Sequence, residues 1–316
     1  MTDAVIVSTA RTPIGKAYKG ALNNTEGATL LGHAISSALS RAEIDPAEVE
    51  DVVMGCAMQQ GTTGTNIARK ALLRAGLPVT TAGTTIDRQC ASGLQAIALA
   101  ARSVIFDGVE IAIGGGGESI SLVQNNQMNT FHAVDPELLA MKGDAYMAML
   151  DTAEIVAKRY DISRERQDEY SLESQRRTAS ARQGGRFNDE LAPIKTTMAV
   201  TDKATSAVSY QKVTLSADEG PRPDTTAEGH CRRQTGEGPG LHHHRRQCEP
   251  ALRRRKCCRH HERQARRKRG CSRSASSAAS SRPVASPTRW ASARSTPCPG
   301  FSSVTDLRST ISIFGN

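Results

Sequence analysis

Cys90 lies between TTID, a short run of strand-type residues, and ASGLQAIALAARSV, a long apolar run with helical spacing. A cysteine just ahead of a helix has its sulfur near unpaired backbone N–H groups and the positive end of the helix dipole. Both favour the thiolate, which is the nucleophilic form of a thiol. Ser92 and Gly93 are small enough to let another element approach the start of this helix. The stretch therefore predicts a nucleophilic cysteine, with the alternative that Cys90 fills a small core site.

Few other residues in the first 229 offer comparable chemistry. His33 and His132 are the only histidines there, and His33 falls within a predicted core helix. The glycine run 114–117 lacks the lysine and spacing of a P-loop and the spacing of a dinucleotide fingerprint, so it predicts a close backbone turn. No metal site is predicted in this part of the chain.

Composition divides the 316 residues into two kinds of sequence. Residues 1–229 carry 22 basic and 28 acidic side chains, a net charge of −6, whereas residues 230–316 carry 19 and 4, a net charge of +15. Six of the eight cysteines also fall in the second part. Its apolar residues follow no period of 2 or 3.6, so we expect a globular core only in the first part and an unfolded tail.

The first 121 residues alternate between strand and helix patterns. Such alternation predicts an α/β fold with a mostly parallel sheet covered by helices. The predicted strands are residues 4–9, 52–56, 84–87 and 110–114, and the predicted helices are residues 28–42, 66–75 and 91–106.

The pattern becomes less regular after residue 121. Residues 122–229 combine short amphipathic helices at 152–159 and 164–182 with loops, and the prolines of DEGPRPDTT indicate a surface loop. Three regions are therefore expected: an α/β core at 1–121, a covering region at 122–229, and a basic tail at 230–316.

Several segments in order resemble the thiolase family. IDRQCASGLQAIALA is similar to the cysteine motif of that family, and four more matching segments extend the resemblance over about residues 1–229. These are VIVSTARTPIGKAYKGAL, VVMGCAMQQGTTGTNIARKALLRAGLP, GGGGESIS and TAEIVAKRYDISRERQDEYSLESQ, and DEGPRPDTT follows at the family's spacing. The implied fold is the N-terminal half of the thiolase fold.

The resemblance implies acyl transfer between coenzyme A thioesters, as in acetyl-CoA C-acyltransferases and acetyl-CoA acetyltransferases. Cys90 matches the cysteine that carries the acyl group, and its backbone N–H could donate to the oxyanion. Met149 matches an acyl-pocket methionine, although the family's MGTTAE reads MLDTAE here, and its alternative is a core methionine. Arg222 matches a residue that contacts the nucleotide end of coenzyme A, and its alternative is a solvated loop arginine. Acyl-CoA and CoA are the expected partners, no further cofactor is implied, and a homo-oligomer is expected.

The resemblance stops near Gly229. The family's GNAS-type asparagine motif, its GHP histidine and its second cysteine are not present after that point. Codons compatible with LHHHRRQCEPALRRR, moved by one nucleotide, encode FTITAGNASQLSDG, which again resembles the family. We therefore predict out-of-frame translation from near Gly229, with a second shift before residue 285. This chain is then an inactive acyltransferase or, as the alternative, a fragment that acts only by pairing with other subunits or binding polyanions.

The composition of the tail could suggest a polyanion-binding or a metal-binding segment. RRRKCCRHHERQARRKRG could bind polyanions through charge, but it has no aromatic interleaving, so no specific nucleic acid is expected. Cys257, Cys258, His260 and His261 lack the spacing of a zinc site.

The N-terminus shows no signal pattern and no run reaches the ~18 apolar residues of a membrane span, which favours a cytoplasmic protein without membrane contact.

Overall fold

The computed structural model describes residues 3–202, 204–226 and 308–314, the last of these by their backbone alone. The described residues up to Asp224, together with 308–314, belong to one compact unit, the first of two into which the chain divides. All elements described below belong to the first unit. A boundary at residue 121 within it stays a prediction, and the remaining expectations for the tail lie outside the described residues.

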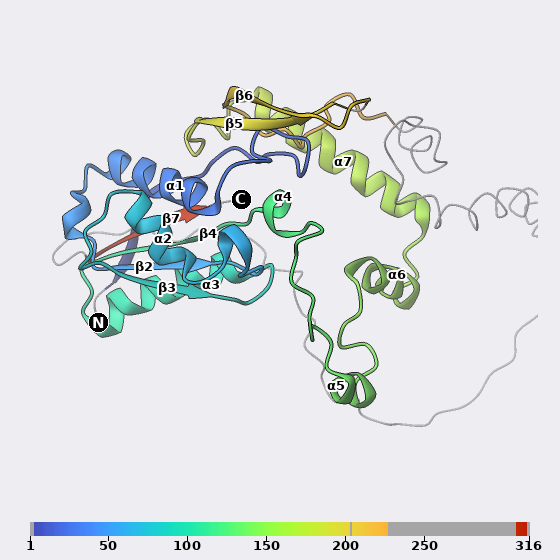
Figure 1. The fold of residues 1–316 in the computed structure, drawn as a ribbon, viewed down its shortest axis with the longest axis horizontal. Coiled ribbons are helices and arrows are strands. Elements are labelled where there is room, and N and C mark those ends of the chain that lie inside the picture. The colour runs from blue at the N-terminus through green and yellow to red at the C-terminus, as the bar shows by residue number, and fades with distance from the viewer. Residues whose placement is uncertain (1–2, 203, 227–307, 315–316) are drawn as a thin grey trace, which may run out of the picture. The chain divides into compact units, whose positions relative to one another are not determined.

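The centre of this unit is a five-stranded sheet in the order β1-β7-β4-β2-β3, in which all paired strands are parallel (Figure 1). The mostly parallel sheet predicted from the sequence is therefore confirmed. The strands are β1 at Ala4–Ala10, β2 at Asp51–Gly55, β3 at Ala82–Ile86, β4 at Ile111–Gly116 and β7 at Arg308–Phe314.

Helices cover both faces of the sheet (Figure 1). Helices α1 (Gly27–Ala42) and α2 (Ile67–Arg74) pack with Val52 and Met54 of β2. Helix α3 (Ser92–Arg102) packs on the other face, where Ala96 and Ala100 share a core with Val53. Because successive strand residues point to opposite faces, burial on both faces explains the apolar run at residues 52–54.

Short elements complete this core. The π-helical turn η3 at Ser103–Asp107 continues α3, and the 3-10 turns η1 and η2 lie at Pro46–Glu48 and Gly61–Thr63. Helix α2 begins after Asn66, whose side chain accepts from the backbone N–H of Arg69. The predicted helices are thus confirmed to within a few residues at each end, apart from the change to a π turn at residue 103.

The expectation of a turn at the glycine run is wrong for its first three residues. Gly114, Gly115 and Gly116 are the last residues of β4. A Cβ at Gly114 would lie 2.6 Å from the Cα of Ile97 in α3. The glycines therefore let the helix approach the sheet closely without ending the strand.

The expectation of an unfolded tail is wrong for Arg308–Phe314. These residues form β7, which pairs with β1 on one side and with β4 on the other. A short segment of alternating polar and apolar residues can complete a sheet whose two neighbouring strands are already in place. So short an alternation is too weak a periodic signal to predict the strand from the sequence.

The covering region contains four helices and a hairpin in the described residues. The helices are α4 at Ile120–Val123, α5 at Pro136–Met141, α6 at Met149–Arg159 and α7 at Arg164–Gln183. The antiparallel pair β5 (Ile194–Thr201) and β6 (Val208–Leu215) was not predicted. Ile194 and Leu215 share a small core with Leu22 and Leu30.

Large apolar side chains remain exposed on the described surface. Leu94 of α3 is 62% exposed and Phe131 is 84% exposed. The stretch Gln89–Asp107 is long and apolar enough to cross a membrane by length and composition alone, a test that core helices also pass. Here α3 packs against the sheet, so Leu94 marks a face of α3 that the described residues leave uncovered.

Arg11 joins the end of β1 to the covering region. Its guanidinium donates two hydrogen bonds to Asp218, at 2.7 and 3.0 Å, and a third to Glu190 at 2.7 Å. Burial alone would raise the pKa of Asp218, but the hydrogen bonds from Arg11 and from the Ile14 N–H outweigh it and hold that pKa below its usual value. The charged pair is therefore favoured in the folded state.

We expect Arg11→Ala to lower the free energy of unfolding by about 2–3 kcal/mol, because it leaves Asp218 half-buried without its partner. Arg177→Ala removes an exposed ion pair to Glu173 and should leave the urea midpoint unchanged. Because the pKa of Asp218 is depressed, its contribution is present above pH ~4 and is lost as the pH falls through the folded-state pKa. Urea titrations at pH 7 and pH 3 check this; equal losses for Arg11→Ala at both values would contradict it.

Candidate functional site

Cys90 lies in a tight turn between the end of β3 at Ile86 and the start of α3 at Ser92, and its side chain is exposed. Its neighbour Gln89 has a φ of 51°, in the left-handed region that non-glycine residues rarely adopt. A local hydrogen-bond ring holds this conformation: the Arg88 N–H donates to Ser92 Oγ at 2.8 Å, and Ser92 Oγ donates to the Gln89 carbonyl at 2.6 Å. The turn thus presents a thiol ahead of a helix.

Glycines at the ends of β2 and β4, Gly55 and Gly116, let the start of α3 approach the sheet. An added Cβ at Gly55, the last residue of β2, would collide with the backbone of Ser92 and lie 2.5 Å from the Gly93 nitrogen. One at Gly116 would lie 2.6 Å from the Gly55 carbonyl oxygen. The carboxyl ends of two parallel strands therefore touch the helix start directly. We call Gly55, Ser92, Gly93 and Gly116 the glycine junction.

Glu118 fixes the loop that follows β2. Its carboxylate accepts from the Ala57 N–H at 2.5 Å and the Met58 N–H at 3.4 Å, and the Cys56 thiol lies 3.7 Å away as a donor. Burial, followed by the negative charge of Glu118, raises the pKa of Cys56 to about 11. Cys56 is therefore a neutral structural thiol, in contrast to the exposed Cys90.

Met149 and Arg222 lie on other elements than those that form the glycine junction. Met149 is the first residue of α6 and is 74% exposed, so the alternative that it is a core methionine is wrong. Arg222 is exposed in the loop after β6, and its backbone N–H donates to Gln175 Oε1 at 2.9 Å. Their contacts with a substrate stay predictions.

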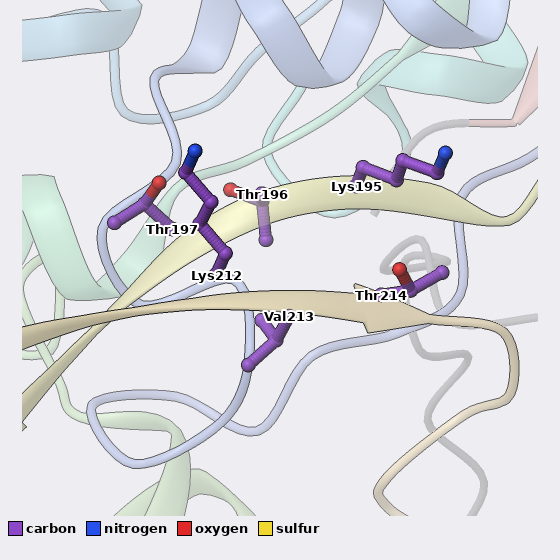
Figure 2. A pocket seen from close by; sticks show the side chains of 6 residues that line it. All are labelled: Lys195, Thr196, Thr197, Lys212, Val213 and Thr214. Atoms are coloured by element: carbon purple, nitrogen blue, oxygen red, sulfur yellow. The ribbon is translucent and has the colours of Figure 1, made fainter.

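Other ligand sites have little support in the described part of the chain. It holds no group of three or more His, Cys, Asp or Glu residues placed to bind a metal. The Cys257–His261 cluster lies outside it. A shallow hollow on the β5–β6 hairpin is lined by Lys195, Thr196, Thr197, Lys212, Val213 and Thr214 (Figure 2). These surface lysines and threonines include none of the predicted site residues.

Comparison with known proteins agrees with this geometry. The profile described as thiolase, N-terminal domain, matches residues 4–232. A 3-ketoacyl-CoA thiolase of Bacillus subtilis is 41% identical over 230 residues, covering 72% of this chain and 58% of the relative. An acetyl-CoA acetyltransferase of Cupriavidus necator is 38% identical over 204 residues, covering 61% and 51%. The chain belongs to the thiolase family.

Coverage of the relatives is partial. The peroxisomal 3-ketoacyl-CoA thiolase 1 of Arabidopsis thaliana is 34% identical over 229 residues, which is 72% of this chain and 50% of the relative. The chain thus spans about half the length of the curated relatives it matches. The match ends at residue 232, close to the point near Gly229 where the resemblance was expected to stop.

The role of Cys90 stays a prediction, and sequence reasoning missed the residues that position its turn. The strained Gln89 has no signal in a single sequence. Glu118 follows a predicted strand within GGGGES, and a carboxylate directly after a buried strand is a signal for a role at the sheet edge. Gly55 stands at the end of an apolar run, where a glycine indicates close backbone approach.

We expect Gly55→Ala to displace the start of α3, because the added methyl group meets backbone atoms that cannot move aside. The cost should be about 1–3 kcal/mol, with a slower reaction of Cys90 with iodoacetamide. Gly93→Ala is the matched control, since its nearest contact is at 4.0 Å. Urea midpoints and peptide mapping measure both effects. Equal behaviour of the two variants would contradict the close approach.

Native-state alkylation should separate the two thiols of the core. At pH 8 a thiol of pKa about 11 is thiolate in roughly one molecule in a thousand, and Cys56 is also buried. Cys90 should therefore be labelled first, and Cys56 only after urea is added. Mass spectrometry of the tryptic peptides reports each site separately. Labelling of Cys56 at the rate of Cys90 would show that the Glu118 loop does not protect it.

Proposed function

We propose that Cys90 is the acyl-carrying nucleophile of a thiolase-type acyltransferase. The observation that carries the proposal is an exposed thiol at a strained turn, one residue ahead of the α3 N-cap, in a chain of the thiolase family. The substrates are coenzyme A thioesters, as the names of the relatives indicate for those proteins. Both 3-ketoacyl-CoA cleavage and acetoacetyl-CoA-type condensation fit this chemistry.

The first half-reaction forms a thioester on the protein. The Cys90 thiolate attacks the thioester carbonyl carbon, the new S–C bond forms, the bond to the coenzyme A sulfur breaks, and CoA leaves as a thiolate that takes up a proton. The electrostatics of a helix start favour the attacking thiolate, and a backbone N–H at the turn can stabilise the oxyanion. The acyl group then passes to a carbon nucleophile or to another CoA.

Met149 and Arg222 extend the proposal to the substrate. We assign to Met149 a place beside the acyl chain, because it is an exposed apolar side chain. Arg222, an exposed residue in the loop after β6, would contact the phosphates at the nucleotide end of CoA. A cytoplasmic location and a homo-oligomer complete the proposal.

Full turnover is not expected of this chain. The base that activates the cysteine and the second cysteine of the family have no counterpart in its sequence. Each proton transfer of this kind typically accelerates its reaction ~10²- to 10⁴-fold. The chain should therefore form the acyl-enzyme slowly and not complete the carbon–carbon step that follows.

Incubation with radiolabelled acetyl-CoA, followed by peptide mapping, tests the proposal. We expect label on the Cys90 peptide, none in Cys90→Ser, and unchanged label in Cys56→Ser, provided that circular dichroism shows both variants folded. Added CoA should remove the label, because the step is reversible. A Cys90 peptide without label in the folded protein would favour the inert fragment instead.

A further inference from the structure

Glu219, in the loop after β6, binds the backbone of a loop that lies about 200 residues earlier in the chain. Its carboxylate accepts from the Lys16 N–H at 2.7 Å and from the Ala21 N–H at 3.1 Å. Its own backbone N–H donates to the Ile14 carbonyl at 3.0 Å. One residue thus joins the loop at residues 14–21 to the loop that follows β6.

The packing around this side chain selects a carboxylate. Gly20 is buried, and a Cβ added there would collide with Glu219 Oε2, so the glycine makes room for the acid. A carboxylate has two acceptor oxygens and can satisfy both of the N–H groups that face it. An amide of the same size would turn its NH₂ group toward at least one of these N–H groups, and that hydrogen bond would be lost.

The same early loop is fixed near the edge of the sheet where the candidate nucleophile lies. The Tyr18 N–H donates to Ser121 Oγ at 2.8 Å, and the Tyr18 hydroxyl donates to the Gln124 carbonyl at 2.8 Å. Ser121 belongs to α4, which begins two residues after Glu118, the residue that holds the loop after β2. A continuous chain of contacts therefore runs from the carboxyl edge of the sheet through Tyr18 to Glu219.

Arg222 lies three residues beyond Glu219, and helix α7 holds its backbone from the other side. The Arg222 N–H donates to Gln175 Oε1 at 2.9 Å. Arg182 of α7 also donates to the Asp218 carbonyl, at 3.5 Å. This short segment is therefore fixed at both of its ends, by the early loop at one and by α7 at the other.

We infer that Glu219 and Gln175 are positioning residues for coenzyme A, because they hold the backbone of Arg222 at a fixed place relative to Cys90. The inference rests on the proposed function, in which Arg222 contacts the nucleotide end of CoA and Cys90 attacks the thioester end. A ligand that is held at both ends binds more tightly when the two contact points are already in place, since less ordering accompanies binding. Loss of either positioning residue weakens the grip on the nucleotide end and leaves the chemistry at sulfur unchanged.

Electrostatics alone predicts the opposite result for Glu219. Because this acid is only three residues from Arg222, removal of its charge would lower the repulsion of the CoA phosphates and tighten binding. Weaker binding in Glu219→Gln therefore indicates lost positioning and not a changed charge. Gln175→Ala alters no charge and should weaken binding as well.

Acylation kinetics of the full-length chain test the inference. With radiolabelled acetyl-CoA, Glu219→Gln and Gln175→Ala should each raise the half-saturating concentration roughly three- to tenfold, the effect of about one hydrogen bond. The limiting rate of Cys90 acylation should be unchanged. S-acetyl-N-acetylcysteamine, a thioester without the nucleotide end, should acylate all variants at the same rate. Glu165→Gln, which neutralises an exposed acid in the first turn of α7, is the matched control and should behave as the unaltered chain.

Two kinetic results would overturn the inference. One is an unchanged half-saturating concentration in every variant that circular dichroism shows to be folded. The other is an equal loss of rate with the short thioester, since this indicates a general disturbance of the site. Calorimetric titration with CoA separates the inference from the proposed function. Weaker CoA binding in the two variants supports the positioning even if Cys90 takes no label, whereas an unaltered chain that binds no CoA contradicts it.

Discussion

The close approach between Gly55 at the end of β2 and the backbone of Ser92 is the constraint on which the site depends. Because no side chain separates them, the start of α3 lies directly on the carboxyl edge of the sheet. The residues between β3 and α3 are thereby compressed into a turn that places Gln89 at a positive φ and leaves the Cys90 side chain exposed. A slightly larger residue in β2 would move the helix dipole and the thiol together.

Contacts distant in sequence hold this arrangement in place. Glu118, which follows β4, binds the loop after β2, and Arg11, which follows β1, binds Asp218 across more than 200 residues. Each uses a charged group to satisfy several donors or acceptors at once, which is why neither side chain can be replaced by an apolar one of similar size. The ion pairs of Arg11 with Glu190 and Asp218, and the small core around Ile194 and Leu215, tie the covering region to the first part of the chain.

The sequence was informative where burial on both faces of a strand imposed a pattern. Apolar runs and helical periods predicted β1, β2, β3, β4 and α1–α3 with small errors at their ends. They also placed Cys90 correctly at a strand-to-helix boundary. The β5–β6 hairpin was missed because its outer face is polar and threonine-rich, so no long apolar alternation marks it. β7 was missed because its partners are set by the tertiary fold. The positive φ of Gln89 was missed because it is seen only in the folded turn, whose Ser92 lies against Gly55 of β2.

The pairing of β1 with β7 has a consequence for synthesis on the ribosome. The first strand to emerge waits for a strand partner that is translated about 300 residues later, which at 5–20 residues per second is roughly 15–60 s. During that interval α1 can cover one face of β1, but its edge hydrogen-bonding groups stay open to nascent chains on neighbouring ribosomes. Holdase chaperones that bind extended segments would thus act on β1 rather than on the helices.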